Sequence, residues 1–376
     1  MRKMSNKKQR TTLEIEISPA FLIIFIVTVV LLISLVVGLF VVMNRDKGPV
    51  VGGSNPGGGK TPGGGDLPVG DTVKTPLYPT VETRSSYLIT TPSGIDMAPD
   101  ITSNTVLVKL SAGALTSVVE KNAGEKIYPA SMTKVMTLLV ACERVTDLDA
   151  MLTITEDHIA YYKAYCQDGS TIFDIWGDPD LPGERISVKN ALYLISYESD
   201  TIACMLIAEH IAGSQEEFVK LMNQKVTSLG LTGTNFVNCT GLHTENHYST
   251  CKDMASIAAY ALDNELAKTI LLSTTDASFK SDKFYTAKDP TKKVTYYVTA
   301  PGWYKDRFDK NAQLDTVTLI GGKTGWEPNL VTSLLTVAKA SDGTLYINVV
   351  ANKIGSYVNI ANSTKDVKHI YNTYVN

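Results

Sequence analysis

The sequence contains little that would support a disulfide scaffold, a metal centre or a nucleic-acid interface. Its 376 residues include 5 cysteines and 5 histidines, and 35 basic residues stand against 38 acidic ones, a formal net charge of -3. Nucleic-acid-binding domains usually carry a basic patch and a high isoelectric point. We therefore expect no nucleic-acid partner. The ordinary globular composition leaves room for one large domain or two small ones.

The cysteines are too few to build a disulfide framework, and their odd number leaves at least one thiol unpaired. They are Cys142, Cys166, Cys204, Cys239 and Cys251. Cys142 and Cys204 lie inside apolar helical patterns, which favours buried thiols. Cys239 and Cys251 flank a predicted loop, and whether they pair is left open.

A zinc peptidase is the metal site that the histidines could suggest, because HTENH places His243 and His247 four residues apart. That spacing suits a metal ion only on a helix. The preceding Thr-Gly-Leu and the asparagine inside the motif favour a loop instead. We therefore predict no metal site and no cofactor.

One apolar run stands out against this background. FLIIFIVTVVLLISLVVGLFVVM, residues 21–43, contains no charge and is long enough to cross a bilayer as a helix. The apolar core of a cleaved signal peptide is shorter, which favours an uncleaved anchor over cleavage. Basic residues precede the run: Arg2, Lys3, Lys7, Lys8 and Arg10. By the positive-inside rule, residues 1–20 form a cytoplasmic tail and the remaining chain lies outside.

Glycine and proline dominate the segment that follows, residues 44–83, which includes GPVVGGSNPGGGKTPGGGDLPVGD. Such a composition buries too little apolar surface to offset its conformational entropy, so we predict a flexible tether. A glycine-rich tether of this length has a root-mean-square reach of roughly 35 Å. We assign residues 84–376 to the globular domain.

The globular part mixes strands and helices. Alternating apolar residues predict strands at 86–91, 104–110, 317–325, 331–338 and 344–353. Helical periodicity follows residue 131, continues through 188–212, and returns after residues 214 and 250 and at 364–374. Strands at both ends with helices between them predict an α+β fold. In this fold, the first and last strands meet in one antiparallel sheet flanked by helices.

The stretch PASMTKVMTLLVACERV, residues 129–145, places Ser131 and Lys134 at the start of a helical pattern. Residues i and i+3 share a helix face, so the amine can reach the hydroxyl. Burial beside Met132 and Val135 disfavours the ammonium form and makes Lys134 a usable base. By itself, S-x-x-K also occurs by chance around an ordinary solvated lysine.

A second segment, GGKTGW at residues 321–326, ends a predicted strand. It presents the cation of Lys323 and the hydroxyl of Thr324 at the strand edge. Gly325 has no side chain, which lets a peptide-like ligand lie alongside. By itself, the segment is equally typical of a glycine-rich turn with a solvated lysine.

A third segment, LISYESDTIACMLIAEHIAG, has Ser199 at the predicted start of a helix, followed by Asp200 and Thr201. By itself, it is explained by helix capping, because serine and aspartate are common N-caps.

In this order, the three segments resemble the signature of the active-site serine penicillin-recognising enzymes, S-x-x-K, an S-x-N-type motif and K-T-G. The chain is more specifically similar to the low-molecular-mass penicillin-binding proteins that act as D-alanyl-D-alanine carboxypeptidases. Further blocks carry the likeness: KNAGEKIYPASMTKVMT, PGERISVKNALYLI, FVKLMNQKVTSLGLTGTNFVNCTGL and HYSTCKDMA. The resemblance implies a β-lactamase/transpeptidase-like fold.

The resemblance also implies roles for individual residues. Ser131 is the expected nucleophile and Lys134 its base, and Ser199 relays the proton to the leaving group. Lys323 and Thr324 are expected to hold the substrate carboxylate beside Gly325. The oxyanion hole implied by the family is the backbone N–H groups of Ser131 and Trp326.

Two features depart from the family pattern. Thr201 stands where the second motif usually ends in asparagine, and a hydroxyl lacks the paired donors of an amide. The residues after Lys323 leave no room for the β-rich C-terminal domain and membrane-binding helix of many relatives. We expect the N-terminal helix, residues 21–43, to supply the membrane anchor instead.

The expected protein is therefore a single-pass protein of a bacterial cell membrane with its catalytic domain outside the cytoplasm. The expected partners are peptidoglycan stem peptides ending in D-Ala-D-Ala, and β-lactam antibiotics. Three alternatives remain: a β-lactamase, a transpeptidase, and a catalytically weak penicillin-binding sensor or scaffold. No E-x-x-L-N follows Ser199, which disfavours a class A β-lactamase, and Thr201 keeps the sensor open.

Overall fold

The computed structural model describes residues 75–78, 87–111, 113–165, 182–272, 279–286, 289–298, 314–327, 330–355 and 360–375. All of them belong to one compact unit, Thr72–Asn376. The predicted cytoplasmic tail and transmembrane helix, and most of the predicted tether, lie outside the described residues. None of the helices in the described part has the length and the apolar sequence that crossing a bilayer requires.

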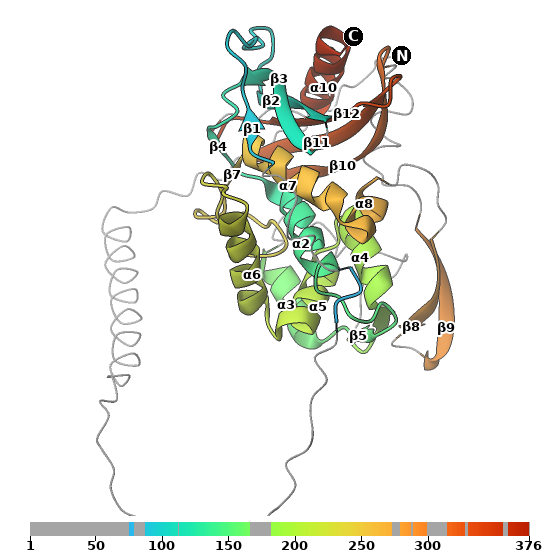
Figure 1. Cartoon of the computed structure of the whole chain (residues 1–376). Helices are drawn as coiled ribbons and strands as arrows, with labels where there is room; N and C mark the ends of the chain where they lie inside the picture. The colour runs from blue at the N-terminus through green and yellow to red at the C-terminus, as the bar shows by residue number, and fades with distance from the viewer. Residues whose placement is uncertain are drawn as a thin grey trace, which may run out of the picture. The chain divides into compact units, whose positions relative to one another are not determined.

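A six-stranded sheet forms the upper part of the domain in Figure 1. Its strands run in the order β1 (Ile89–Thr90), β3 (Ala114–Lys121), β2 (Asn104–Ser111), β12 (Leu345–Ala351), β11 (Val331–Ala340) and β10 (Val317–Glu327). All neighbouring pairs are antiparallel except the short β1–β3 pair. Because β2 pairs with β12, the predicted meeting of the first and last strands is confirmed.

The sheet is buried on both faces. Helix α10 (Ile360–Tyr374) covers one face, and α7 (Cys251–Asp263) packs on the other face as part of a layer of helices (Figure 1). Alternate side chains of β2 divide between the two layers. Val106 and Val108 join the larger core on the helical side, whereas Leu107 joins the smaller core under α10. This two-sided burial makes the sheet a rigid base for the residues on its edge.

Helix α2 (Thr133–Cys142) runs through the centre of the larger core, and all ten of its residues are buried. The surrounding helices are α3 (Glu156–Tyr165), α4 (Val188–Tyr197), α5 (Thr201–Ala212), α6 (Gln215–Ser228) and α8 (Glu265–Leu271). Smaller sheets complete the fold: β4 (Lys126–Ile127) with β7 (Ser249–Thr250), and β5 (Met151–Thr153), β6 (Arg185–Ser187), β8 (Phe279–Thr286) and β9 (Asp289–Val298).

Two predicted helix starts are confirmed in atomic detail. The Ser214 hydroxyl accepts a hydrogen bond from the Glu217 N–H, which caps α6. Thr250 caps α7 in the same way through the Asp253 N–H. Both caps satisfy a backbone donor that a helix start otherwise leaves free.

The helical periodicity across 188–212 covers two helices, α4 and α5, which are separated at residues 198–200. The prediction that Ser199 begins the second helix is wrong, because α5 begins at Thr201. Ser199 lies between the two helices with a φ of 59°, and Asp200 is the N-cap of α5. Periodicity continued through this point because the flanking apolar residues pack into the same core. Helix α10 also begins earlier than predicted, at Ile360.

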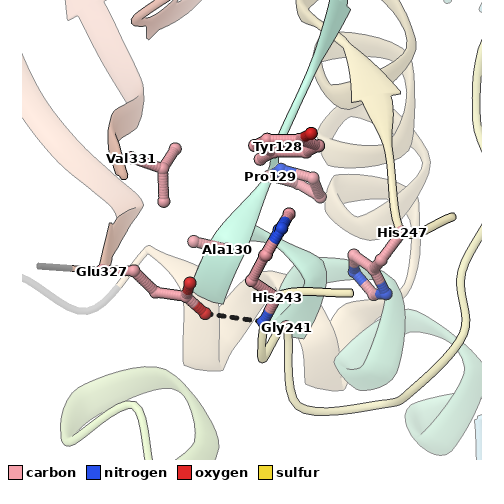
Figure 2. Close-up of a pocket in the computed structure, with 8 residues that line it drawn as sticks. All are labelled: Tyr128, Pro129, Ala130, Gly241, His243, His247, Glu327 and Val331. Carbon is pink, nitrogen blue, oxygen red and sulfur yellow. Dashed lines mark hydrogen bonds between the residues drawn. The ribbon is translucent and has the colours of Figure 1, made fainter. Parts of the chain in front are cut away.

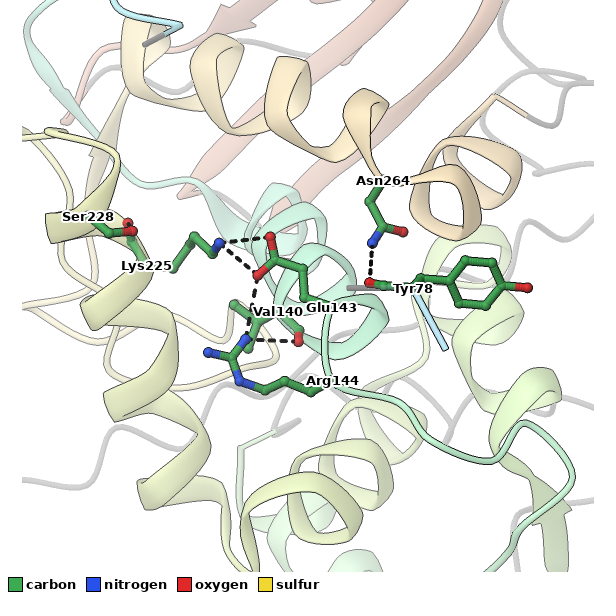
Figure 3. A network of polar contacts seen from close by, with 7 residues as sticks. All are labelled: Tyr78, Val140, Glu143, Arg144, Lys225, Ser228 and Asn264. Atoms are coloured by element: carbon green, nitrogen blue, oxygen red, sulfur yellow. Dashed lines mark hydrogen bonds and ion pairs between the residues drawn. The ribbon is translucent and has the colours of Figure 1, made fainter. Parts of the chain in front are cut away.

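The end of α2 remote from Ser131 is held by polar contacts (Figure 3). The Glu143 carboxylate is buried and pairs with Lys225 of α6 at 2.7 Å and with Arg144 at 3.5 Å. Near this end, the Leu77 N–H donates to the Val145 carbonyl. Asn264 Nδ2 also donates to the Tyr78 carbonyl at 3.2 Å. Residues 75–78, which fall inside the predicted tether, therefore contact the domain.

The cysteines in the described part of the chain are free thiols, all buried: Cys142, Cys204, Cys239 and Cys251. The prediction of buried thiols at Cys142 and Cys204 is confirmed. The open question on Cys239 and Cys251 is answered, because the two are not paired. Burial raises the pKa of both thiols, which makes them unreactive.

Candidate active site

Ser131 lies in a single turn of 3₁₀-helix, Ala130–Met132, that runs directly into α2. It is the only partly exposed residue of that turn, between buried Ala130 and Met132. Ala130 has a φ of 45°, a left-handed conformation that a residue with a Cβ rarely adopts. Such strain persists only where neighbouring structure imposes it, and here two glycines provide the contacts.

Gly241 and Gly325 both pack closely against this turn. A Cβ on Gly241 would lie 2.1 Å from the Ala130 carbonyl oxygen, and one on Gly325 would lie 2.6 Å from the Pro129 carbonyl oxygen. Only glycine fits at either place. The structure therefore gives Gly325 a packing role against the Ser131 turn, in addition to the expected freedom for a ligand.

The Lys134 side chain is buried with 1% of its surface exposed. Its Nζ lies 3.2 Å from Ser131 Oγ and 2.5 Å from the Thr240 carbonyl oxygen. Both contacts are with uncharged oxygens, and the Asp200 carboxyl lies nearby. The predicted contact between Ser131 and Lys134 is present.

Ser199 and Lys323 form a second contact, although they are 124 positions apart in sequence. The Lys323 ammonium donates to Ser199 Oγ at 2.9 Å and to the Thr324 carbonyl at 3.0 Å. Lys323 is as deeply buried as Lys134, which excludes the solvated lysine that the glycine-rich turn alone would have suggested.

The turn around Ser199 is fastened at both ends. The N–H groups of Glu198 and Asp200 both donate to the Leu194 carbonyl, at 3.0 and 3.2 Å. Asp200 Oδ1 accepts from the Ala203 N–H at 2.8 Å, which caps α5. Ser199 is therefore held at the tip of a short, strained turn.

Burial dominates the electrostatics of the two acids beside Ser199. It raises the pKa of the Asp200 carboxyl, although the Ala203 N–H and the nearby Lys134 act in the opposite direction. Burial also raises the pKa of Glu198, with a further contribution from Asp200, whereas Lys323 lowers it. Two acids and two lysines thus lie close together around the serine hydroxyls.

The remaining predicted residues lie on β10 and α5. β10 is the edge strand of the sheet, and Thr324 on it is partly exposed. The Trp326 side chain has 47% of its surface exposed. Thr201 is the first residue of α5 and is buried. Within the described part of the chain, β10 pairs with a strand on one side only, so its other edge has no paired strand.

A small pocket is lined by Tyr128, Ala130, His243, Glu327 and their neighbours (Figure 2). The His243 N–H donates to Glu327 Oε1 at 2.7 Å, and the His243 ring meets the Tyr128 ring edge-on with centroids 4.3 Å apart. These contacts fasten the loop that carries Gly241 to the end of β10.

His247 uses both ring nitrogens within the core. Its Nδ1 accepts from the Val237 N–H at 3.1 Å, and its Nε2 lies 2.8 Å from Thr133 Oγ1. Burial lowers its pKa to about 3, with smaller contributions from His243 and Lys134. His243 and His247 both lie in the loop between α6 and β7, outside any helix, as the sequence indicates. No cluster of three metal-binding side chains occurs in the described part.

The sequence reasoning missed Asn238, which is buried below Lys134 in the loop that joins α6 to β7. Its side chain contacts the backbone of the three residues 240–242. The only local signal was the glycine three residues later in NCTG, because asparagine and glycine at this spacing are typical of a turn in which the asparagine side chain binds the backbone.

Comparisons with known proteins show the family to which the chain belongs. Residues 95–353 match the family model described as D-alanyl-D-alanine carboxypeptidase, peptidase family S11. The chain is 39% identical over 160 residues to D-alanyl-D-alanine carboxypeptidase DacF of Bacillus subtilis. Over 154 residues it is 34% identical to D-alanyl-D-alanine carboxypeptidase DacC of Escherichia coli. These matches cover 43% and 40% of this chain, and 39% and 36% of the relatives' own lengths.

Solved structures share the fold. The Streptomyces K15 DD-transpeptidase superposes with a TM-score of 0.59 at 22% identity, covering 73% of this chain and 97% of its own. Penicillin binding protein 5 from Haemophilus influenzae gives a TM-score of 0.54 at 26% identity, covering 72% and 70%. The chain belongs to the D-alanyl-D-alanine carboxypeptidase family, peptidase S11, and has the fold of the DD-transpeptidases and penicillin-binding proteins.

Proposed function

We propose that this protein is a serine D-Ala-D-Ala carboxypeptidase that removes the terminal D-alanine of peptidoglycan stem peptides, and that penicillin acylates the same serine. The observation that carries the proposal is the contact of 3.2 Å between the buried Lys134 amine and Ser131 Oγ. A neutral amine at this distance is a proton acceptor for the serine hydroxyl. Family membership supports the choice of substrate.

In the acylation step, Ser131 Oγ attacks the carbonyl carbon of the penultimate D-alanine while its proton passes to Lys134 Nζ. The backbone N–H groups of Ser131 and Trp326 bind the oxyanion. The close packing of Gly325 on Pro129 supports this pairing, because it brings the two N–H groups onto adjoining elements.

Collapse of the tetrahedral intermediate breaks the carbon–nitrogen bond and leaves the acyl group as an ester on Ser131. The proton that Lys134 took from Ser131 passes through the Ser199 hydroxyl to the leaving nitrogen, which makes Lys134 a neutral amine again. The Lys323 ammonium donates a hydrogen bond to this hydroxyl. Water then attacks the ester and gives a proton to Lys134, which returns it to Ser131 Oγ as the shortened peptide leaves. No metal or organic cofactor takes part in these steps.

The substrate binds along the open edge of β10 as an added strand. Lys323 and Thr324 hold its terminal carboxylate through charge-assisted contacts. The exposed Trp326 ring lies where the preceding residues of the stem peptide pass, and Thr201 borders the opposite side of the cleft. A substrate ending in an amide instead of a carboxylate would lose the contact with Lys323.

Two assays on the full chain test this function. Incubation with a diacyl-Lys-D-Ala-D-Ala peptide should release D-alanine, and fluorescent penicillin should label the protein covalently. Ser131→Ala should lose both, whereas Ser228→Ala, a control on the exposed face of α6, should keep both. Labelling that persists in Ser131→Ala would contradict the assignment of the nucleophile.

Thr201 favours a second candidate, a penicillin-binding sensor that is acylated but turns over slowly. An asparagine at this position would offer the substrate amide paired hydrogen-bond groups that a threonine hydroxyl lacks. The same assays separate the candidates. Penicillin labelling without release of D-alanine would identify a sensor, whereas D-alanine release at many turnovers would identify the carboxypeptidase.

We also propose that residues 21–43 anchor the protein in a bacterial cell membrane, with residues 1–20 in the cytoplasm and the domain outside. The uncharged run and the basic residues before it support this topology. Protease added to intact spheroplasts should cleave the tether, residues 44–83, and release the domain. A fully protected domain would show that the orientation is wrong.

A further inference from the structure

Asn238 uses both the oxygen and the nitrogen of its side-chain amide to bind the backbone of the loop that contacts Lys134. Its Oδ1 accepts three hydrogen bonds: from the Thr240 N–H at 3.2 Å, the Thr240 hydroxyl at 3.1 Å and the Gly241 N–H at 2.7 Å. Its Nδ2 donates to the Leu242 carbonyl at 2.8 Å. Asn238, Thr240 and Gly241 are buried, so the N–H groups of Thr240 and Gly241 depend on this side chain for a hydrogen-bond partner.

The loop that Asn238 shapes touches both partners of the proposed acylation step. The Thr240 carbonyl accepts from Lys134 Nζ, and Gly241 packs on the Ala130 carbonyl immediately before Ser131. A rotation of the peptide between Thr240 and Gly241 would move the acceptor away from the amine and push against the nucleophile turn.

A second contact fixes the same loop to α2. Thr137, one turn after Lys134, donates its hydroxyl proton to the Cys239 carbonyl at 2.7 Å. The loop is therefore attached to α2 at Thr137 and at Lys134, and Asn238 determines the backbone conformation between these points. Lysine has four rotatable bonds in its side chain, so it needs such a fixed acceptor to hold one position.

We propose that Asn238 is a positioning residue for the general base: it holds the Thr240 carbonyl that directs the Lys134 amine toward Ser131. The inference rests on the proposed function, because it assigns Asn238 a part in the reaction that Lys134 performs. It reaches beyond the three sequence motifs to a residue outside all of them.

An amide is the side chain that these contacts require. Aspartate would keep the three accepted hydrogen bonds, but it would lose the donor to the Leu242 carbonyl and add a negative charge near Lys134. The titratable groups that face Lys134 are Asp200 and Cys204 at the start of α5, and Cys239 and His247 in the loop between α6 and β7. An added carboxylate on this loop would favour the ammonium form of Lys134.

The test compares Asn238→Asp and Asn238→Leu in the full chain, using penicillin acylation from pH 5 to 10. Asn238→Leu should lower the acylation rate about 10- to 100-fold at every pH, because a misplaced base loses up to roughly that factor. The acylation rate of Asn238→Asp should be reduced by the same factor near pH 6. At alkaline pH, where Lys134 loses its proton, this rate should recover to within a few-fold of the wild-type rate. The acid limb of its profile therefore moves to higher pH.

Asn223→Asp is the matched control. The Asn223 side chain also forms two hydrogen bonds with the backbone of one residue, Phe236. Its Nδ2 donates to the Phe236 carbonyl at 2.8 Å, and its Oδ1 accepts from the Phe236 N–H at 3.0 Å. The acylation profile of Asn223→Asp should follow the wild type. A shift equal to that of Asn238→Asp would overturn the proposal, because any weakened clamp would then have the same effect.

A measurement without turnover separates this inference from the proposed function. Titration of the Lys134 side chain by NMR, with ¹³C-labelled lysine and Lys134→Arg for assignment, should show its midpoint at higher pH in Asn238→Asp. An unmoved midpoint overturns the positioning role even if penicillin acylation is normal. A shifted midpoint in a protein that penicillin never acylates supports the role of Asn238 and contradicts the proposed function instead. Should Asn238→Leu fail to fold, the aspartate variant alone decides.

Discussion

Two buried lysines lie in the cleft, and they differ in the atoms that surround them. Lys134 contacts the Ser131 hydroxyl and a backbone carbonyl and lies near Asp200, whereas Lys323 donates to the Ser199 hydroxyl and lies near Glu198. Each lysine therefore has one serine hydroxyl within hydrogen-bonding distance and one acid nearby. The proposed tasks of base and cation follow from the serine that each lysine contacts, because only Lys134 contacts the proposed nucleophile.

Arginine substitutions separate these tasks. Lys134→Arg keeps the charge but cannot act as a base, because a guanidinium group does not lose its proton in proteins. Acylation by penicillin should fall by about 10²–10⁴-fold, the usual contribution of one catalytic proton acceptor. Lys323→Arg is the matched control and should retain more activity, since its proposed task needs only a cation. Equal, mild losses at both positions would mean that Lys134 acts only as a charge.

At the scale of elements, helix α2 connects the nucleophile at one end to a buried ion pair at the other. Glu143 and Lys225 pair at 2.7 Å with 5% and 12% of their side chains exposed, and join α2 to α6 (Figure 3). This ion pair therefore fixes the end of α2 that is remote from Ser131 to α6.

Lys225→Met tests the value of this ion pair. Removal of the lysine leaves the buried Glu143 carboxylate with only the longer contact to Arg144, which should cost about 2–4 kcal/mol of unfolding free energy. The control is Lys220→Met, which removes an exposed ion pair on α6 whose side chains are 64% and 56% exposed. This variant should change the free energy of unfolding by less than about 0.5 kcal/mol. Urea denaturation of the two variants and of the wild type measures both differences. Similar losses in both variants would show that the Glu143 site is not effectively buried.

At the scale of the whole molecule, the domain is stabilised by a core that includes a buried neutral histidine. His247 lies between α2 and the loop that follows α6, with both ring nitrogens in hydrogen-bonding distance of protein atoms. Its pKa of about 3 in the folded protein lies well below the value of about 6.5 for an unfolded chain. Between these values, the unfolded state binds a proton that the folded state does not.

Stability should therefore fall with acidification. The contribution of His247 is complete above about pH 6.5 and is lost as the pH falls toward 3. From pH 7 to pH 5, this group alone should remove about 2 kcal/mol of unfolding free energy, which denaturant titrations at the two values would measure. His247→Gln keeps one donor and one acceptor but does not titrate, so its stability should depend less on pH over this interval. An equally steep dependence in the variant would assign the effect to other groups.

Local patterns predicted what local interactions determine. The caps at Ser214 and Thr250, and the contact between Ser131 and Lys134, join residues three apart, so the spacing alone defines them. The antiparallel pairing of the last three strands is also a local property, because only a few residues separate each strand from the next. Two pairs of the proposed site residues are in contact, Ser131 with Lys134 and Ser199 with Lys323, and the roles of all of them stay predictions until they are measured.

What the sequence by itself determined is the fold class, the family and the positions of the three motifs, because these depend on residue type and short-range spacing. Only the tertiary structure decided the contact between Lys323 and Ser199 and the left-handed conformation of Ser199 between α4 and α5. It also decided that Cys239 and Cys251 are free thiols and that Asn238 binds the backbone of the loop that contacts Lys134. Each of these depends on packing between segments far apart in sequence. A left-handed residue such as Ser199 is unfavourable in its own segment, and only the surrounding contacts hold it there.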